Sequence, residues 1–217
     1  MSKFLKWLDN YWYHYKWHTI IISFFLIIGI VSTVQIFNKE SYDAYVMYVG
    51  EKEIPSTKYQ DILQSLKAVS ADYDGDKEHK INFSKSAFIS DPENTMASTI
   101  NTPTVQFLSG LVYQPYYIYL MDLEVYKIYE DEGVFVPISE LFKDVPEDWY
   151  YDETAVYFNK TDYANSFAGV DDLGDNTVLV IKIVPYSSSK RVAAAEKQAY
   201  ENHLDMLKKI LSYRKNG

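Results

Sequence analysis

The longest apolar stretch of the chain runs from Thr19 to Phe37 and reads TIIISFFLIIGIVSTVQIF, nineteen positions without a charged side chain. At about 1.5 Å per helical residue, such a stretch crosses roughly 28 Å of hydrocarbon. A cleaved signal peptide is the alternative, but eighteen residues precede the stretch and no A-x-A-like cleavage site follows it. The pattern therefore predicts an uncleaved transmembrane helix over residues 19–37.

Tryptophan and tyrosine crowd the segment before this helix, residues 1–18. Their rings favour the headgroup region, because one end of each is apolar and the other can hydrogen-bond. Apolar positions at spacings of three and four predict a short interfacial helix that runs into the membrane span. His14 and His18 stand one helical turn apart, but no third metal ligand is near, so we interpret them as interfacial side chains.

Beyond residue 37, strand-like and helix-like patterns alternate. β-Branched and aromatic residues predict strands at 43–50, 80–90 and 116–122, and helical spacing predicts helices at 56–73 and 102–112. This β-α-β-α-β order, joined by right-handed crossovers, is typical of a parallel sheet covered by helices. The sequence therefore predicts an α/β fold with a single N-terminal transmembrane helix followed by one mostly parallel sheet domain, residues 38–217.

The second half of this domain has a looser pattern. We expect a short strand at 155–158, a long and central strand at 176–186, and a closing helix from about 190 to 214. One stripe of the closing helix is predicted to face the core: Val192, Ala195, Ala199, His203, Met206 and Ile210. On that stripe His203 is interpreted as a packed and partnered side chain rather than a ligand.

Charge predicts the orientation in the membrane. Three lysines and one aspartate precede the span, a net charge of +2; the remaining 18 of the chain's 21 basic residues and 29 of its 30 acidic residues follow it, a net charge of −11. The positive-inside rule therefore places residues 1–18 in the cytoplasm and the domain of residues 38–217 outside the cell. An acidic domain repels nucleic acid and anionic lipid headgroups at long range, and we expect neither as a partner.

The absence of cysteine limits the kinds of site and the kinds of membrane anchor that the chain can have. The 217 residues contain none, which excludes disulfides, thiolate metal sites, a cysteine nucleophile and a lipid-modified cysteine anchor. Anchoring is expected to depend on the helix at 19–37. No cofactor is predicted.

One acidic turn, DYDGDK, resembles a calcium loop at first sight. With Asp72 as position 1, Asp74 and Asp76 fall at positions 3 and 5, but position 6 is Lys77 and position 12 is Phe83. An EF-hand loop requires glycine and a bidentate acid at those two positions. We therefore expect a connector between helix and strand, with a weak metal site as the alternative.

No enzyme motif is complete. The S-x-x-K at 187–190 matches the first motif of penicillin-recognising enzymes, but its partner motifs would stand in reversed order and K-T-G is not matched. We interpret these serines as the cap of the closing helix. Phosphate-binding loops, H-E-x-x-H and G-x-S-x-G are missing from the sequence, and we expect a protein that is not an enzyme.

Three stretches together resemble one lobe of the extracytoplasmic solute-binding proteins of ABC importers, the type that binds sugars or peptides: Phe107 to Gly110, Tyr116 to Asp122 and Gly133 to Leu141. The resemblance covers roughly residues 42 to 185, and the entry into the membrane is similar to that of small membrane proteins of Gram-positive bacteria. Two departures matter, since the chain has room for little more than one lobe and its expected anchor is a helix. A single lobe lacks the clamp that buries a small ligand.

The resemblance implies a non-catalytic binding or scaffold domain of the cell envelope, related to a solute-binding lobe. Open α/β sheets bind ligands beyond the carboxyl ends of their strands, which selects the surroundings of Gly50, Asp91 and Asp122. Each has another interpretation: a turn glycine, the residue before Pro92 and a helix cap. The partner is expected to be an envelope protein or a small solute, and the alternative function is solute capture for an importer of a sugar or peptide.

Overall fold

The structure is a computed structural model, which describes residues 3–37, 41–50, 54–87, 107, 111, 116–170, 173, 176–184, 187 and 189–214. The chain divides into two compact units, Met1–Ser41 and Tyr42–Gly217. Each unit has its own internal contacts.

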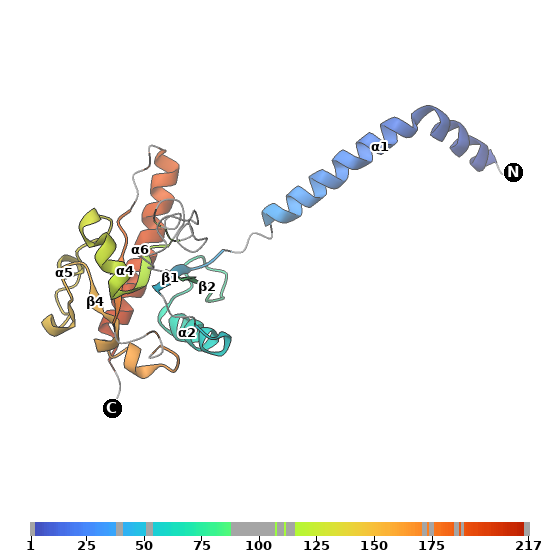
Figure 1. The fold of residues 1–217 in the computed structure, drawn as a ribbon. Coiled ribbons are helices and arrows are strands. Elements are labelled where there is room, and N and C mark those ends of the chain that lie inside the picture. The colour runs from blue at the N-terminus through green and yellow to red at the C-terminus, as the bar shows by residue number, and fades with distance from the viewer. Residues whose placement is uncertain are drawn as a thin grey trace, which may run out of the picture. The chain divides into compact units, whose positions relative to one another are not determined.

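The first unit is one long helix, α1 (Lys3–Phe37). Within it Asn10–Val34 is long and apolar enough to cross a membrane, and none of the most apolar window is buried against other parts of the chain. Apolar side chains exposed in this way suit a hydrocarbon surrounding. The expected interfacial segment is continuous with the expected span, as Figure 1 shows, because no proline or glycine interrupts the helix between them.

The second unit is built on one five-stranded sheet of order β2-β1-β3-β5-β4. Its strands are β1 (Ala44–Gly50), β2 (Ile81–Ala87), β3 (Ile118–Asp122), β4 (Val156–Tyr157) and β5 (Thr177–Ile181). β1 runs parallel to β2 and β3, whereas β5 runs antiparallel to β3 and β4.

The sheet is therefore mixed, and the prediction of a mostly parallel sheet was wrong for β5. The right-handed crossover rule applies to strands joined through a covering helix. Between β4 and β5 the described residues contain only the short 3-10 turns η4 (Phe158–Lys160) and η5 (Ala164–Ser166). Such a connection allows the next strand to return antiparallel beside its predecessor.

Helices cover both faces of the sheet (Figure 1). Their bounds are α2 Ser56–Val69, α4 Leu123–Tyr129, α5 Ile138–Leu141 and α6 Lys190–Ser212, with further 3-10 turns η2 Glu130–Glu132 and η3 Glu147–Trp149. The expected helix at 102–112 lies almost entirely outside the described residues. Pro55 stands at the N-cap position of α2.

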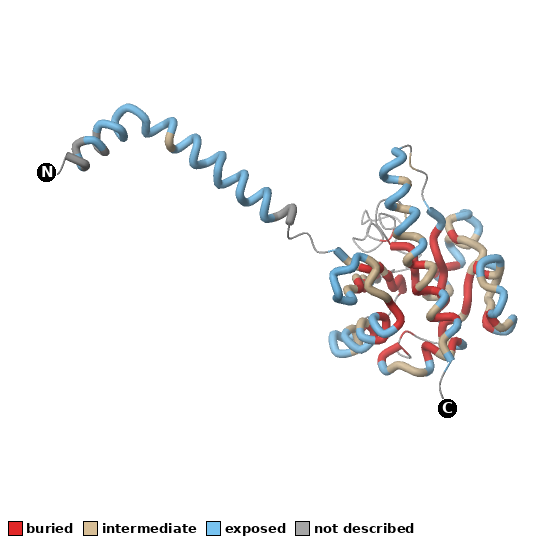
Figure 2. The backbone as a smooth tube through the Cα atoms, turned by 180° about the vertical axis from the view of Figure 1, so that it is seen from behind, coloured by how far each residue is buried: buried red, intermediate tan, exposed pale blue. Residues whose placement is uncertain are grey.

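The alternation of side chains along β1 divides the core in two. Val46 and Tyr48 belong to the cluster that includes α2 and α6, while Met47 and Val49 belong to the cluster that includes α4. Successive residues of a strand point to opposite faces, so a strand covered on both sides needs a continuous apolar run. Figure 2 shows the buried strands at the centre of the unit.

Only the C-terminal part of α6 is buried. Its buried residues are His203, Met206, Leu207, Ile210 and Leu211. Val192, which belongs to the predicted stripe, is 47% exposed. The first turns of α6 carry mainly exposed residues, as the pale blue upper part of this helix in Figure 2 indicates.

Candidate functional site

Two of the three residues selected from the sequence lie together at the carboxyl ends of β1 and β3. Val49 pairs with Met121 in the parallel register, and Gly50 and Asp122 follow directly. The hydroxyl of Tyr48 donates a hydrogen bond to Asp122 Oδ1 at 3.0 Å. The ends of two adjacent parallel strands thus present a carboxylate held by a buried tyrosine.

Glycine at position 50 is required by this close approach. A Cβ atom at Gly50 would lie 2.4 Å from both Asp122 Oδ2 and Tyr48 Oη, and 2.5 Å from Asp122 Cγ. Among the described glycines, those with positive φ are Gly75, Gly133 and Gly169. The interpretation of Gly50 as a turn glycine was therefore wrong: the missing side chain makes room for the carboxylate.

The carboxylate of Asp122 does not cap the helix that follows it. Asp122 stands at the N-cap position of α4, but its side chain makes no capping hydrogen bond. An aspartate at this position normally accepts a bond from a backbone N–H of the first turn. Here its Oδ1 faces Tyr48 instead, so α4 gains no capping hydrogen bond from Asp122.

The site stands where the strand order reverses direction. After β1 the chain forms α2 and pairs β2 on one side of β1, whereas β3 pairs on the other side. In open α/β sheets this reversal is where ligands bind, because the connections leave the sheet in opposite directions there. Asp91, the third selected residue, lies outside the described residues.

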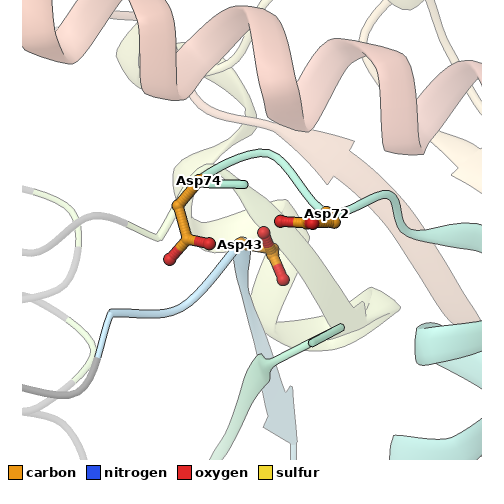
Figure 3. Close-up of side chains that lie close together, drawn as sticks. All are labelled: Asp43, Asp72 and Asp74. Atoms are coloured by element: carbon orange, nitrogen blue, oxygen red, sulfur yellow. The ribbon is translucent and has the colours of Figure 1, made fainter. Parts of the chain in front are cut away.

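The acidic loop forms a second cluster, but with a different membership from the one expected. The carboxylates of Asp43, Asp72 and Asp74 have oxygens that all lie within 4.8 Å of one another. Asp43 directly precedes β1, and Figure 3 shows its carboxylate beside that of Asp72. Asp76 is paired instead with Lys80, at 2.7 Å, which lowers the pKa of Asp76 through the side-chain hydrogen bond.

Backbone N–H groups donate hydrogen bonds to these carboxylates. Asp43 accepts bonds from the N–H groups of Tyr73 at 2.6 Å and Lys80 at 2.8 Å. Asp72 accepts bonds from Gly75 at 2.7 Å and from Lys77 at 2.8 Å. The cluster thus joins the loop to the start of β1, as the connector interpretation expects.

Lys77 adopts the backbone conformation that a calcium loop assigns to its glycine. Its φ is +70°, in the left-handed region that a non-glycine residue rarely enters. The sharp turn is therefore present, but the side chain at its centre is a cation. The three carboxylates can act as hydrogen-bond acceptors, and a metal there would have to displace or share those bonds.

His203 is partnered, as expected from the sequence. Its Nε2 accepts the backbone N–H of Tyr45 at 2.8 Å, and its Nδ1 donates to the carbonyl of Ala199. Only 1% of the residue is exposed. Burial lowers the pKa of His203 to about 4, and the charge of Lys182 contributes in the same direction. A neutral imidazole with both nitrogens occupied joins α6 to the first residues of β1.

Lys182 is a buried cation that sequence reasoning missed. It follows β5, is 3% exposed, and its Nζ lies 5.0 Å from the ring centroid of Tyr117. Burial lowers the pKa of Lys182 to about 8. The pKa of Tyr117 is raised to about 12, first by burial and then by the charge of Glu196. The available signal was a lysine within the apolar run VLVIKIV.

The other motifs lead to no second site. Ser189 is the N-cap residue of α6, as expected, but it forms no side-chain capping bond. The rings of His14 and His18 lie against that of Tyr15, at centroid distances of 6.5 and 6.2 Å. Within the described part of the chain, the acidic cluster is the one group of three or more residues with metal-ligand geometry.

Comparisons with protein-family models, with curated proteins and with solved structures each return no match.

Proposed function

We propose that this chain is a single-span membrane protein whose acidic α/β domain binds a partner or ligand outside the membrane, without catalysis. The proposal includes the relationship to a solute-binding lobe. The observation that carries the binding role is the Gly50, Tyr48 and Asp122 arrangement at the carboxyl ends of two adjacent parallel strands. A carboxylate held there suits a ligand that offers hydrogen-bond donors or positive charge.

Two further observations support binding rather than catalysis. His203, the buried histidine of the domain, has both ring nitrogens engaged by backbone groups, so it has no nitrogen free for acid or base work. The second unit contains one sheet with its own core and no second lobe among its described residues. One sheet surface fits docking better than enclosure of a small solute.

The decisive experiment compares Asp122→Ala with Glu132→Ala in the full chain. Both substitutions remove one carboxylate, but Glu132 is exposed in η2, at the opposite end of α4 from Asp122. Photo-crosslinking on intact cells should capture an envelope partner with the unchanged chain and with Glu132→Ala, and several-fold less with Asp122→Ala. Equal capture by all three proteins would refute the proposed site.

Solute capture is separated from docking by a thermal-shift screen of the compact unit, residues 42–217, against sugars and peptides. A ligand present at 100 times its dissociation constant stabilises a fold by about 2.7 kcal/mol. A shift that Asp122→Ala abolishes would establish solute capture at this site. A silent screen with intact crosslinking would establish docking.

A further inference from the structure

A basic hollow lies between the end of α6 and the segment that follows α5. It has a volume of about 300 Å³, at the lower end of the range for ligand pockets. Its cationic members are Lys143, Lys208 and Arg214, and Asp144 is its one acidic member. The hollow thus has a net charge of +2, within a domain whose net charge is strongly negative.

None of these three cations forms a salt bridge within the described residues, although the charge of Lys208 contributes to the lowered pKa of Asp205. The ion pairs that the structure shows elsewhere on the domain involve other lysines: Lys80, Lys127, Lys197 and Lys209. Like charges gathered in one hollow repel each other, by about 1 kcal/mol per pair at 4 Å even in water. An arrangement of this kind is stabilised by an anion that lies among the charges.

The helix dipole accounts for only part of this arrangement. Cations favour the C-terminal end of a helix because the last carbonyl groups carry partial negative charge, and Lys208 and Arg214 stand at that end of α6. Lys143 comes from a different element, more than sixty positions earlier in the sequence. Its presence in the same hollow is not a consequence of the dipole of α6.

Arg214 is held in place before any ligand arrives. Its Nη1 donates to the carbonyls of Leu211 at 3.2 Å and Tyr213 at 2.9 Å, and its guanidinium carbon lies 5.6 Å from the ring centroid of Trp149. A fixed guanidinium loses less conformational entropy on binding and offers its remaining N–H groups as a planar fork. This is the geometry that binds phosphate oxygens in pairs.

We propose that this hollow binds a phosphoryl group attached to an apolar moiety. A phosphoryl group carries a charge of about −1.5 to −2 near neutral pH, close to the +2 of the lining side chains. The floor is apolar, since Val145 and Leu211 are buried there beside the partly buried Phe142. This site is formed by elements other than the Gly50 and Asp122 site and does not depend on the function proposed above.

The test is a titration of the full chain, held in phosphatidylcholine nanodiscs, by isothermal calorimetry. Pyrophosphate represents a free phosphate source, and added vesicles of phosphatidic acid, whose headgroup is a phosphate monoester, represent a lipid headgroup. Saturable binding of pyrophosphate alone assigns the site to soluble phosphate esters. Binding of the vesicles, whether or not pyrophosphate also binds, assigns the site to lipid headgroups. Saturable binding of neither probe overturns the proposal.

Charge-removing variants locate the binding. Arg214→Gln, Lys143→Gln and Lys208→Gln should each weaken it at least five-fold, while Lys197→Gln, which removes a cation of α6 outside the hollow, should change it less than two-fold. Circular dichroism checks that Arg214→Gln folds, and Lys143→Gln and Lys208→Gln keep the test valid if it does not. Equal loss in Lys197→Gln, or no loss in the three variants, contradicts the proposal.

Discussion

At the scale of single residues, the domain depends on side chains whose roles are set by very close neighbours. Gly50 leaves the space that the Asp122 carboxylate occupies. His203 supplies the acceptor that the N–H of Tyr45 needs at the start of β1. A polar group at the end of a central strand is thus bonded by a residue far away in the sequence, Asp122 by Tyr48 and the N–H of Tyr45 by His203, and buried polar groups left without a partner are costly.

Gly50→Ala is expected to lower the free energy of unfolding by about 1–3 kcal/mol, because the added methyl group would collide with Asp122 and Tyr48. Urea denaturation of residues 42–217 measures the change. The same substitution made in a Tyr48→Phe, Asp122→Ala background should cost clearly less, since both colliding groups are then shortened. An equal cost in the two backgrounds would show that the collision is not the cause.

Because His203 is buried and neutral, we expect the folded domain to lose stability in mild acid. Its folded pKa, about 4, is below the unfolded value of 6.5, so the unfolded chain binds the proton first as the pH falls. Stability is retained above pH 6.5 and decreases towards pH 4, by about 2 kcal/mol between pH 7 and pH 5 for this residue alone. Urea denaturation at a series of pH values measures this slope.

The matched variant for this slope is His203→Gln, which should be less stable at pH 7 but should lose much of the pH dependence between pH 7 and pH 5. Carboxylates contribute mainly below that window. An unchanged slope in His203→Gln would assign the acid sensitivity to other groups.

At the scale of elements, α6 and β5 show that local sequence patterns predict where an element lies in the chain, whereas tertiary contacts determine its burial and direction. The helical period of α6 was evident in the sequence, but its buried part begins only at His203. β5 was expected to be central, and it is buried throughout between β3 and β4. Its direction was not predicted, because an apolar run of five residues is the same whether the strand is parallel or antiparallel.

Leu207→Ala is expected to lower the free energy of unfolding by about 2–5 kcal/mol, because it leaves a cavity at a residue that is fully buried beneath the sheet. Val192→Ala on the same helix is the control. With 47% of Val192 exposed, its truncation should change stability by less than about 0.5 kcal/mol. Thermal and urea unfolding of residues 42–217 compare the two; a large effect at Val192 would contradict the burial assigned to α6.

At the scale of the whole molecule, the chain joins an apolar helix to a compact domain with its own core. The two units differ in what surrounds them: α1 exposes apolar side chains along most of its length, while the second unit encloses its apolar residues on both faces of the sheet. Apolar exposure of this extent is stable in hydrocarbon rather than in water. The division predicts that the two units separate cleanly.

Removal of residues 1–37 is therefore expected to release the domain from the membrane fraction as a folded, soluble protein, whereas the full chain should resist extraction by alkaline carbonate. Fractionation and circular dichroism measure the two outcomes.

External protease on spheroplasts should digest the domain if the proposed orientation is right. Protection of the domain until the membrane is opened would place it in the cytoplasm.

Much of the fold was predictable where the deciding information is local. The spans of α1, β1, α2, β3 and β5 were indicated by apolar periodicity and by length, which depend on neighbouring residues alone. The proximity of Gly50 and Asp122 was anticipated only as a shared position at the strand ends. The hydrogen bond from Tyr48 to Asp122, and the reason that position 50 is a glycine, could not be predicted. Both depend on the register of β1 and β3, which are about seventy residues apart in the sequence.

The sequence by itself determined that α1 is long and apolar enough to span a membrane, that the domain is acidic and that its class is α/β, because composition and periodicity act over short distances. Only the tertiary structure decided that β5 is antiparallel and that Asp43 replaces Asp76 in the acidic cluster. It also brought Lys143 into the hollow beside Arg214. These outcomes depend on which distant segments meet, and that is set by how the whole chain packs its apolar surfaces.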